Sequence, residues 1–269
     1  MDIQMILDTW KPKKQNTMAG VELWDGKAEH FSANELPTAE NSLGMQIIMR
    51  EGMVKKDTCV LDVGCGGGRF AFALEALGAN VAATDFSPRM IEEAEKQRAL
   101  RHSNVSFSVN DWHTLDLADK RWKKQFDLVL ANMTPAVMSA ETFFKLSEAS
   151  RNWCLMVKPA RRANSILDEL ECIVGAEKDS KRLDETIAYS FDLLWLSGYK
   201  PKLEYDDQVR EHNLPLETAI REYTLRLSTA NDLTEKGKAA IRAYLNGVSE
   251  NGVVHECAQT SIVAMYWRV

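Results

Sequence analysis

The chain has 269 residues, 45% of them hydrophobic, and a formal net charge of −6 at pH 7. This length suits one large α/β domain with an insertion, and the acidic balance argues against nucleic acid as a partner, because phosphates require a basic face. No apolar run approaches the roughly 18 residues that a membrane span needs. The five cysteines form no CxxC pair, so we expect neither disulfides nor a metal site. These features predict a cytoplasmic protein without a membrane partner.

Residues 1–37 are polar and aromatic, and we interpret them as an N-terminal arm or lid that precedes the first clear helix. His30 in this segment is a candidate catalytic residue that could orient an acceptor. A solvent-facing histidine beside a packed Phe31 is the alternative. Leu43, Ile47 and Ile48 then recur at helical spacing, which predicts a helix before the first strand.

The most informative segment is residues 60–70, with the sequence VLDVGCGGGRF. It reads as a buried strand, a glycine-rich turn and the start of a helix. Gly64, Gly66 and Gly68 allow left-handed backbone angles and bring bare N–H groups close to a ligand. This arrangement is typical of sites for nucleoside-bearing cofactors. Arg69 stands where the dinucleotide fingerprint needs a small residue, so NAD and FAD are disfavoured.

Three more predicted strands end in polar residues. Residues 81–84 lead into Asp85, 17 residues after Gly68, where a carboxylate can accept hydrogen bonds from both hydroxyls of a ribose. Residues 105–109 lead into Asp111 and Trp112, where the acid could accept from an adenine amino group and the indole could cover the ring. Residues 126–131 lead into the loop 132–135. Ligands of open α/β sheets bind along this carboxyl edge.

Taken together, these motifs resemble the class I S-adenosylmethionine-dependent methyltransferases, in the small-molecule branch often labelled methyltransferase type 11. The resemblance covers residues 20–160 by motif. It implies S-adenosylmethionine (SAM) as cofactor, with its methionine end at Asp62, Gly64 and Gly66, its ribose at Asp85 and its adenine at Asp111 and Trp112. Asn132 and Met133 would line the mouth where the methyl group is transferred. We also assign Cys65, Gly68 and Phe86 to the cofactor site.

The resemblance implies a Rossmann-like sheet of seven mostly parallel strands, the last antiparallel, flanked by helices. We expect a fifth strand at 153–157, helices at 165–173 and 184–196, a sixth strand at 202–205 and the last strand at 253–267. The excursion between the last two strands contains two amphipathic helices. We assign 38–206 plus 252–269 to the cofactor-binding domain and 207–251 to an inserted helical cap, which could cover the substrate or merely the sheet.

The reaction expected is methyl transfer to a small-molecule acceptor by in-line displacement. Proximity and orientation can supply about 7–11 kcal/mol and a general base roughly 3–5.5 kcal/mol, so positioning and desolvation suffice without a dedicated base. Asn132 and Thr134 join His30 as candidate catalytic residues. A SAM-binding sensor or partner subunit without turnover is the alternative. An aminopropyl transferase is disfavoured, because residues 132–134 offer no acid for a polyamine. The acceptor and the oligomeric state are left open.

Overall fold

The computed structural model describes residues 2–11, 35–230 and 232–269. The helices are α1 (Ile3–Thr9), α4 (Leu43–Arg50), α5 (Arg69–Ala76), α6 (Pro88–Arg101), α7 (Ala140–Ala149), α8 (Leu167–Val174), α9 (Asp179–Leu196), α10 (Leu216–Ala230) and α11 (Glu235–Val248). The strands are β1 (Cys59–Val63), β2 (Asn80–Asp85), β3 (Ser106–Val109), β4 (Phe126–Asn132), β5 (Ser150–Asn164), β6 (Lys202–Pro215) and β7 (Val253–Arg268).

The strands form one sheet in the order β3-β2-β1-β4-β5-β7-β6. Neighbours from β3 to β5 pair in parallel, and β7 runs antiparallel to both β5 and β6. The Rossmann-like sheet expected from the sequence, with an antiparallel last strand, is therefore confirmed. Its strand order changes direction next to β1, and the carboxyl ends of β1, β2, β3 and β4 meet at one edge, where ligands of such sheets bind.

Two apolar layers hold this sheet. Side chains alternate along each strand, so Val60 of β1 faces the α4 and α5 side while its neighbour Leu61 faces the α7 and α9 side. The first layer contains Ile47 and Ile48, whose helical spacing predicted α4. The same alternation continues into the polar residues at the carboxyl ends of these strands, and it decides which side of the sheet each functional side chain faces.

The N-terminal segment differs from the expectation that no helix precedes residue 37. Residues Ile3–Thr9 form α1, which begins where the Asp2 side chain accepts from the Met5 N–H at 2.8 Å. Ile6 and Trp10 are buried in the second layer, and the Trp10 ring lies 5.8 Å from that of Phe143. Two apolar residues one turn apart therefore anchor α1 on α7 and α9. The other residues of the predicted lid, 12–34, lie outside the described part.

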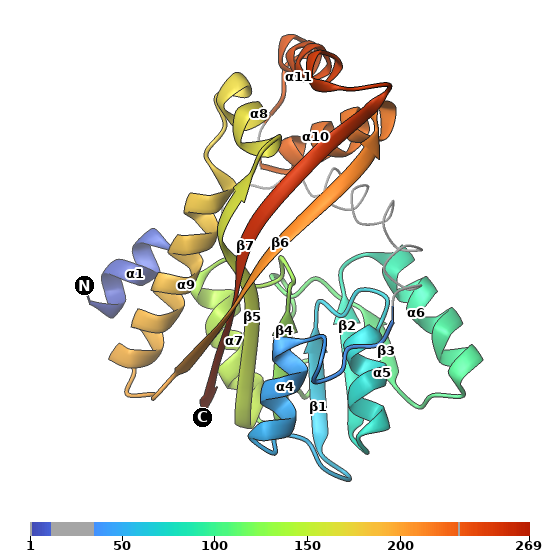
Figure 1. The fold of residues 1–269 in the computed structure, drawn as a ribbon. Coiled ribbons are helices and arrows are strands. Elements are labelled where there is room, and N and C mark those ends of the chain that lie inside the picture. Colours follow the sequence, from blue (N-terminus) through green and yellow to red (C-terminus); the bar gives the residue numbers. More distant parts are fainter. Residues whose placement is uncertain (1, 12–34, 231) are drawn as a thin grey trace.

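The late strands are longer than predicted. β5, β6 and β7 continue beyond the central sheet, and α8, α10 and α11 pack on their extension (Figure 1). The sixth strand was expected at 202–205 but extends to Pro215. Residues 206–213 are mostly polar, so their sequence does not indicate a strand, and only their pairing with β7 makes them one. Helices α10 and α11 lie within the predicted cap range, and their buried stripe includes Ile220, Tyr223 and Ile241. None of the described helices has the length and apolarity to cross a membrane.

Candidate active site

The glycine-rich turn connects β1 to α5 and is fixed by the end of β2. The N–H groups of Gly64 and Cys65 donate to the Thr84 carbonyl at 2.8 and 3.0 Å. Gly64, Gly66 and Gly68 all have positive φ, so the prediction that this turn needs left-handed angles is correct. A Cβ on Gly68 would lie 2.7 Å from the Phe107 ring, which is an additional reason for glycine there.

Asp62 is the central charged group of the site. It is 2% exposed on the α5 side of β1, and among the described residues its Oδ2 atom has no hydrogen-bond partner. Burial, reinforced by the negative charge of Asp85, raises the pKa of Asp62 to about 7, and a hydrogen bond from the Ala71 N–H acts in the opposite direction. A buried carboxylate oxygen without a donor is costly and favours a ligand that brings one.

Asp85 ends β2 and holds the turn. Its Oδ2 accepts from the Gly66 N–H and its Oδ1 from the Ser87 N–H, both at 2.9 Å. These two bonds fix the orientation of the carboxylate against the turn. Phe86 follows directly and is half-buried. Cys65 belongs to the glycine turn and is close enough to Asp62 and Asp85 for their charges to act on it. Burial raises the pKa of its thiol well above the usual range.

The residues after β3 divide into an exposed acid and a buried indole. The Asp111 side chain is exposed, and its Oδ1 accepts from the His113 N–H at 2.9 Å. Trp112 is only 2% exposed, and its indole N–H donates to the Thr142 carbonyl at 3.0 Å. The indole therefore packs in the core layer of α7, while Asp111 stands at the sheet edge.

The loop after β4 closes over the glycine turn. Asn132 lies on the α4 side, so close that a Cβ on Gly44 would be 3.4 Å from its Oδ1 atom. Met133 has a φ of +52° and is exposed, and its N–H donates to the Val157 carbonyl at 2.8 Å. Thr134 is buried against Gly64, and its Oγ1 accepts from the Ala136 N–H at 3.1 Å. This loop therefore packs directly on the glycine turn.

Two buried lysines that the sequence analysis missed hold the surrounding loops. Lys158 of β5 donates to the Thr134 carbonyl at 2.9 Å. Lys145 of α7 donates to the carbonyls of Trp112, His113 and Leu115 at 2.9, 3.2 and 3.0 Å. The signal for Lys145 is a lysine inside the apolar stripe of an amphipathic helix.

The structure brings most of the predicted site residues to one edge. Asp62, the glycine turn, Asp85, Phe86, Asp111, Asn132, Met133 and Thr134 all stand at or just beyond the carboxyl ends of β1 to β4. His30 lies outside the described residues. His212, His255 and Cys257 have side chains of the kind that binds metals, but they do not share a face: His212 pairs with Glu256 and so faces the opposite side of the sheet from His255 and Cys257. Within residues 2–11, 35–230 and 232–269, no cluster of metal-ligating side chains is found.

Comparisons with known proteins agree with this geometry. Residues 54–179 match a family model described as a methyltransferase domain. An uncharacterized protein of Haemophilus influenzae is 25% identical over 262 residues, which cover 91% of this chain and 88% of that protein. A Bacillus halodurans protein described as a candidate methyltransferase has a TM-score of 0.52 at 17% identity, over 83% of this chain and 97% of that one. The MccD protein has a TM-score of 0.50 at 13% identity, over 87% and 99%.

The two solved structures show that the fold is shared, and the family model adds the activity class. Residues 54–179 carry a methyltransferase domain, and the sheet that contains them has the Rossmann-like fold of the class I, S-adenosylmethionine-dependent methyltransferases. The resemblance to class I methyltransferases is therefore confirmed, and the matched region, 54–179, contains the glycine turn, both buried acids and the loop after β4. The enzyme class is SAM-dependent methyltransferase.

Proposed function

We propose that this protein binds SAM in the glycine turn and transfers its methyl group to a small-molecule acceptor. The observation that carries the proposal is the Oδ2 atom of Asp62, a buried carboxylate oxygen without a donor among the described residues, beside a glycine turn that presents backbone rather than side chains. The α-ammonium of the methionine end is a donor of the right charge. Asp85 accepts from the ribose and Asp111 from the adenine amino group.

The residues present fit this cofactor from end to end. Asp62 and Asp85 are close enough for each charge to act on the other, so a cation near Asp62 relieves a repulsion that the unliganded protein carries. Gly64, Cys65, Gly66 and Gly68 supply backbone rather than side chains. The indole of Trp112 is packed in the core, so we assign it support of the adenine loop and not ring stacking.

When bound, SAM supplies an electrophilic methyl group on its sulfonium. The chain's own contribution is to align the acceptor with that group and to exclude water, which can account for about 7–11 kcal/mol. Asn132 and Met133 line the mouth from the end of β4. Thr134 is a positioning residue, because its hydroxyl is engaged by Ala136 and packed on Gly64. Of the candidate catalytic groups in the described part, we assign contact with the acceptor to Asn132.

Calorimetric titration with SAM and with its demethylated product tests the binding step. We expect Asp85→Ala to weaken binding strongly, since it removes the ribose acceptor and the bond that holds Gly66. Asp62→Asn should weaken binding about 10–100-fold, as expected for one charged hydrogen bond. Asp127→Asn is the matched control, because Asp127 is paired with Arg151 near the start of β4, at the opposite end of the strands. Unchanged binding in the first two variants would refute the assignment.

Turnover is tested separately from binding. Incubation of the purified protein with methyl-labelled SAM and a metabolite extract should transfer label to a low-mass compound. Normal binding without transfer to any compound would instead favour the alternative, a SAM-binding sensor or partner subunit that has lost turnover. Transfer of label only to macromolecules would contradict a small-molecule acceptor.

A further inference from the structure

Strand β6 forms one edge of the sheet and offers a long, regular backbone. It pairs with β7 in continuous register over its 14 residues, from Lys202 to Pro215, without a bulge. Within the described chain, no segment pairs with its other edge. Sheet edges are commonly blunted by bulges, internal prolines, short length or charged side chains; β6 carries the charges but has none of the other features before its last residue.

The side chains of β6 alternate between two surfaces. Lys202, Glu204, Asp206, Gln208, Arg210 and His212 share one face, and Tyr205 and Val209 lie on the other, where they are 63% and 66% exposed. On the first face, Arg210 donates to Gln208 and Gln208 donates to Asp206, each at 2.6 Å. An acid and a base are therefore held along the open edge, two residues to either side of Gln208.

We propose that a second copy of this chain binds this edge, so that β6 pairs with β6 of the partner subunit, antiparallel, about a two-fold axis at Gln208. In this register, residues equally far before and after Gln208 lie opposite each other across the interface. Asp206 then faces Arg210 of the partner subunit, and Glu204 faces His212 of the partner subunit. The symmetry repeats both pairs, so two Asp206–Arg210 pairs of opposite charge and two Glu204–His212 pairs flank the axis.

The charge pattern selects this axis among its neighbours. A two-fold axis through such a pair must place one residue opposite itself. At 206, 207, 210 or 211 it would oppose two like charges directly. At Tyr205 it would set Glu204 against Asp206, and at Val209 it would set Asp207 against Glu211. From residue 205 to residue 211, Gln208 is the position that avoids every like-charge pair.

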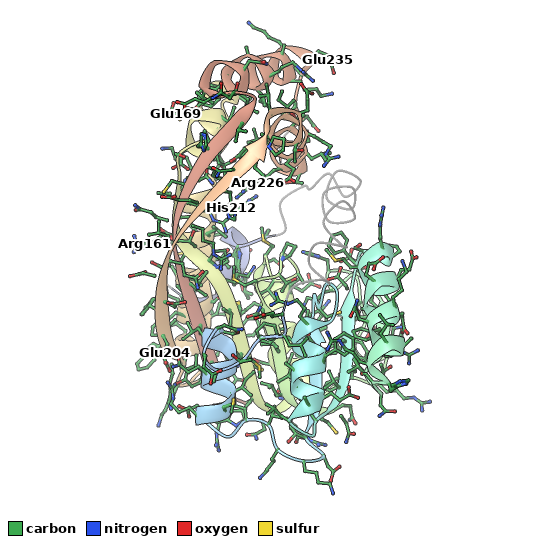
Figure 2. All side chains as sticks on the ribbon, turned by 45° about the vertical axis from the view of Figure 1, so that its right-hand side comes forward. Arg161, Glu169, Glu204, His212, Arg226 and Glu235 are labelled. Carbon is green, nitrogen blue, oxygen red and sulfur yellow. The ribbon has the colours of Figure 1, made fainter. Side chains whose placement is uncertain are left out.

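The remaining contacts agree with the same register. The exposed Val209 side chains of the two subunits become diagonal neighbours on the face of β6 that carries Tyr205 and Val209. Their backbones are then about 7–8 Å apart, which is close enough for the side chains to touch. Figure 2 shows Glu204 near the α4 end of β6 and His212 near its other end, below α10, so the paired charges span most of the strand. Glu204 also accepts from Arg50 of α4, which fixes its position at the edge.

Charge-exchange variants test this assembly. Size-exclusion chromatography with light scattering should give a dimer for the wild type. Asp206→Arg alone and Arg210→Asp alone should each give monomers, because like charges then meet at two places in the interface. An equimolar mixture of the two single variants should form a heterodimer, since every facing pair is again of opposite sign. The double variant should dimerise with itself.

Circular dichroism and Tm of the single variants establish that they remain folded. A general structural role for Arg210 would not be rescued by mixing with a chain that carries a different substitution. Because the interface adds a strand to the edge, Val209→Lys should also weaken the dimer, whereas Val248→Lys, at an exposed position on α11, should leave it intact. A monomeric wild type at all concentrations, or single variants that do not associate when mixed, would overturn the proposal.

Discussion

Thr134 closes directly onto Gly64. A Cβ on Gly64 would lie 1.9 Å from the Thr134 Oγ1 atom and 2.6 Å from its Cβ, and Gly64 has a φ of +69°. The loop after β4 and the turn after β1 are therefore in contact through the smallest possible residue. Since Asn132 and Met133 belong to the same loop, this contact sets the distance between the proposed methyl-transfer mouth and the cofactor turn.

Gly64→Ala should be strongly destabilising. The added methyl must displace Thr134, at about 1–3 kcal/mol, and alanine must adopt a left-handed conformation, at about 1–2 kcal/mol. We expect a loss of about 2–5 kcal/mol in urea unfolding. Gly252→Ala is the matched control, because Gly252 also has a positive φ of +76° but no atom within 4 Å of the added methyl. It should lose only the conformational part, and equal losses in both variants would contradict the contact.

The cofactor edge was predictable from the sequence because its residues stand at or just beyond the carboxyl ends of strands with a clear apolar pattern. Asp62, Asp85 and Asn132 inherit their positions from the alternation of β1, β2 and β4, and one glycine pattern marks the turn. Because these strands pair in parallel, their carboxyl ends meet at one edge of the sheet. Local patterns were therefore sufficient for these positions.

Tertiary contacts decided the features that the sequence did not reveal. β6 beyond Tyr205 is polar on both faces and becomes a strand only by pairing with β7. Trp112 was expected over a ligand, yet its indole is buried beside α7, a helix that begins 28 residues later. The carbonyl groups that Lys145 binds come from a loop, and no periodicity predicts such a contact. The short helix α1 has too few turns for a clear pattern.

Asp62 should make the unliganded protein less stable as the pH rises. Its folded pKa of about 7 lies above the ordinary aspartate value of 3.8, so the folded state holds the proton more tightly than the unfolded state. Stability from this group is present at low pH, falls between about pH 4 and pH 7, and does not return above that. Asp62→Asn should therefore raise Tm at about pH 8 without cofactor, with the gain shrinking towards pH 4. A lower Tm at pH 8 would contradict the burial argument.

The same residue should make cofactor affinity depend on pH in the opposite sense. An ammonium group binds the ionised carboxylate, and below its pKa of about 7 Asp62 is mainly protonated. SAM affinity should rise about tenfold between about pH 6 and pH 7.5, with a proton released on binding at the lower pH. Calorimetry in buffers of different ionisation enthalpy measures both quantities. In Asp62→Asn the rise should disappear, and an equal slope in the variant would assign the titration to another group.

Lys145 should be a support of the adenine side of the site. It is 9% exposed, and its ammonium group binds three carbonyls of the loop that follows Asp111, with the Trp112 ring 5.7 Å away. Lys145→Met keeps the apolar stem but leaves those carbonyls without their donor, which should cost about 2–4 kcal/mol.

The loop can then leave its position, so SAM affinity should fall as well, although Lys145 is proposed to touch no part of the cofactor. Lys238→Met is the control, because Lys238 makes an exposed ion pair with Glu235 on α11 and its loss should change stability by less than about 0.5 kcal/mol. Urea unfolding and calorimetry on both variants separate the two effects. A destabilised Lys145→Met protein that still binds SAM normally would contradict this supporting role of Lys145.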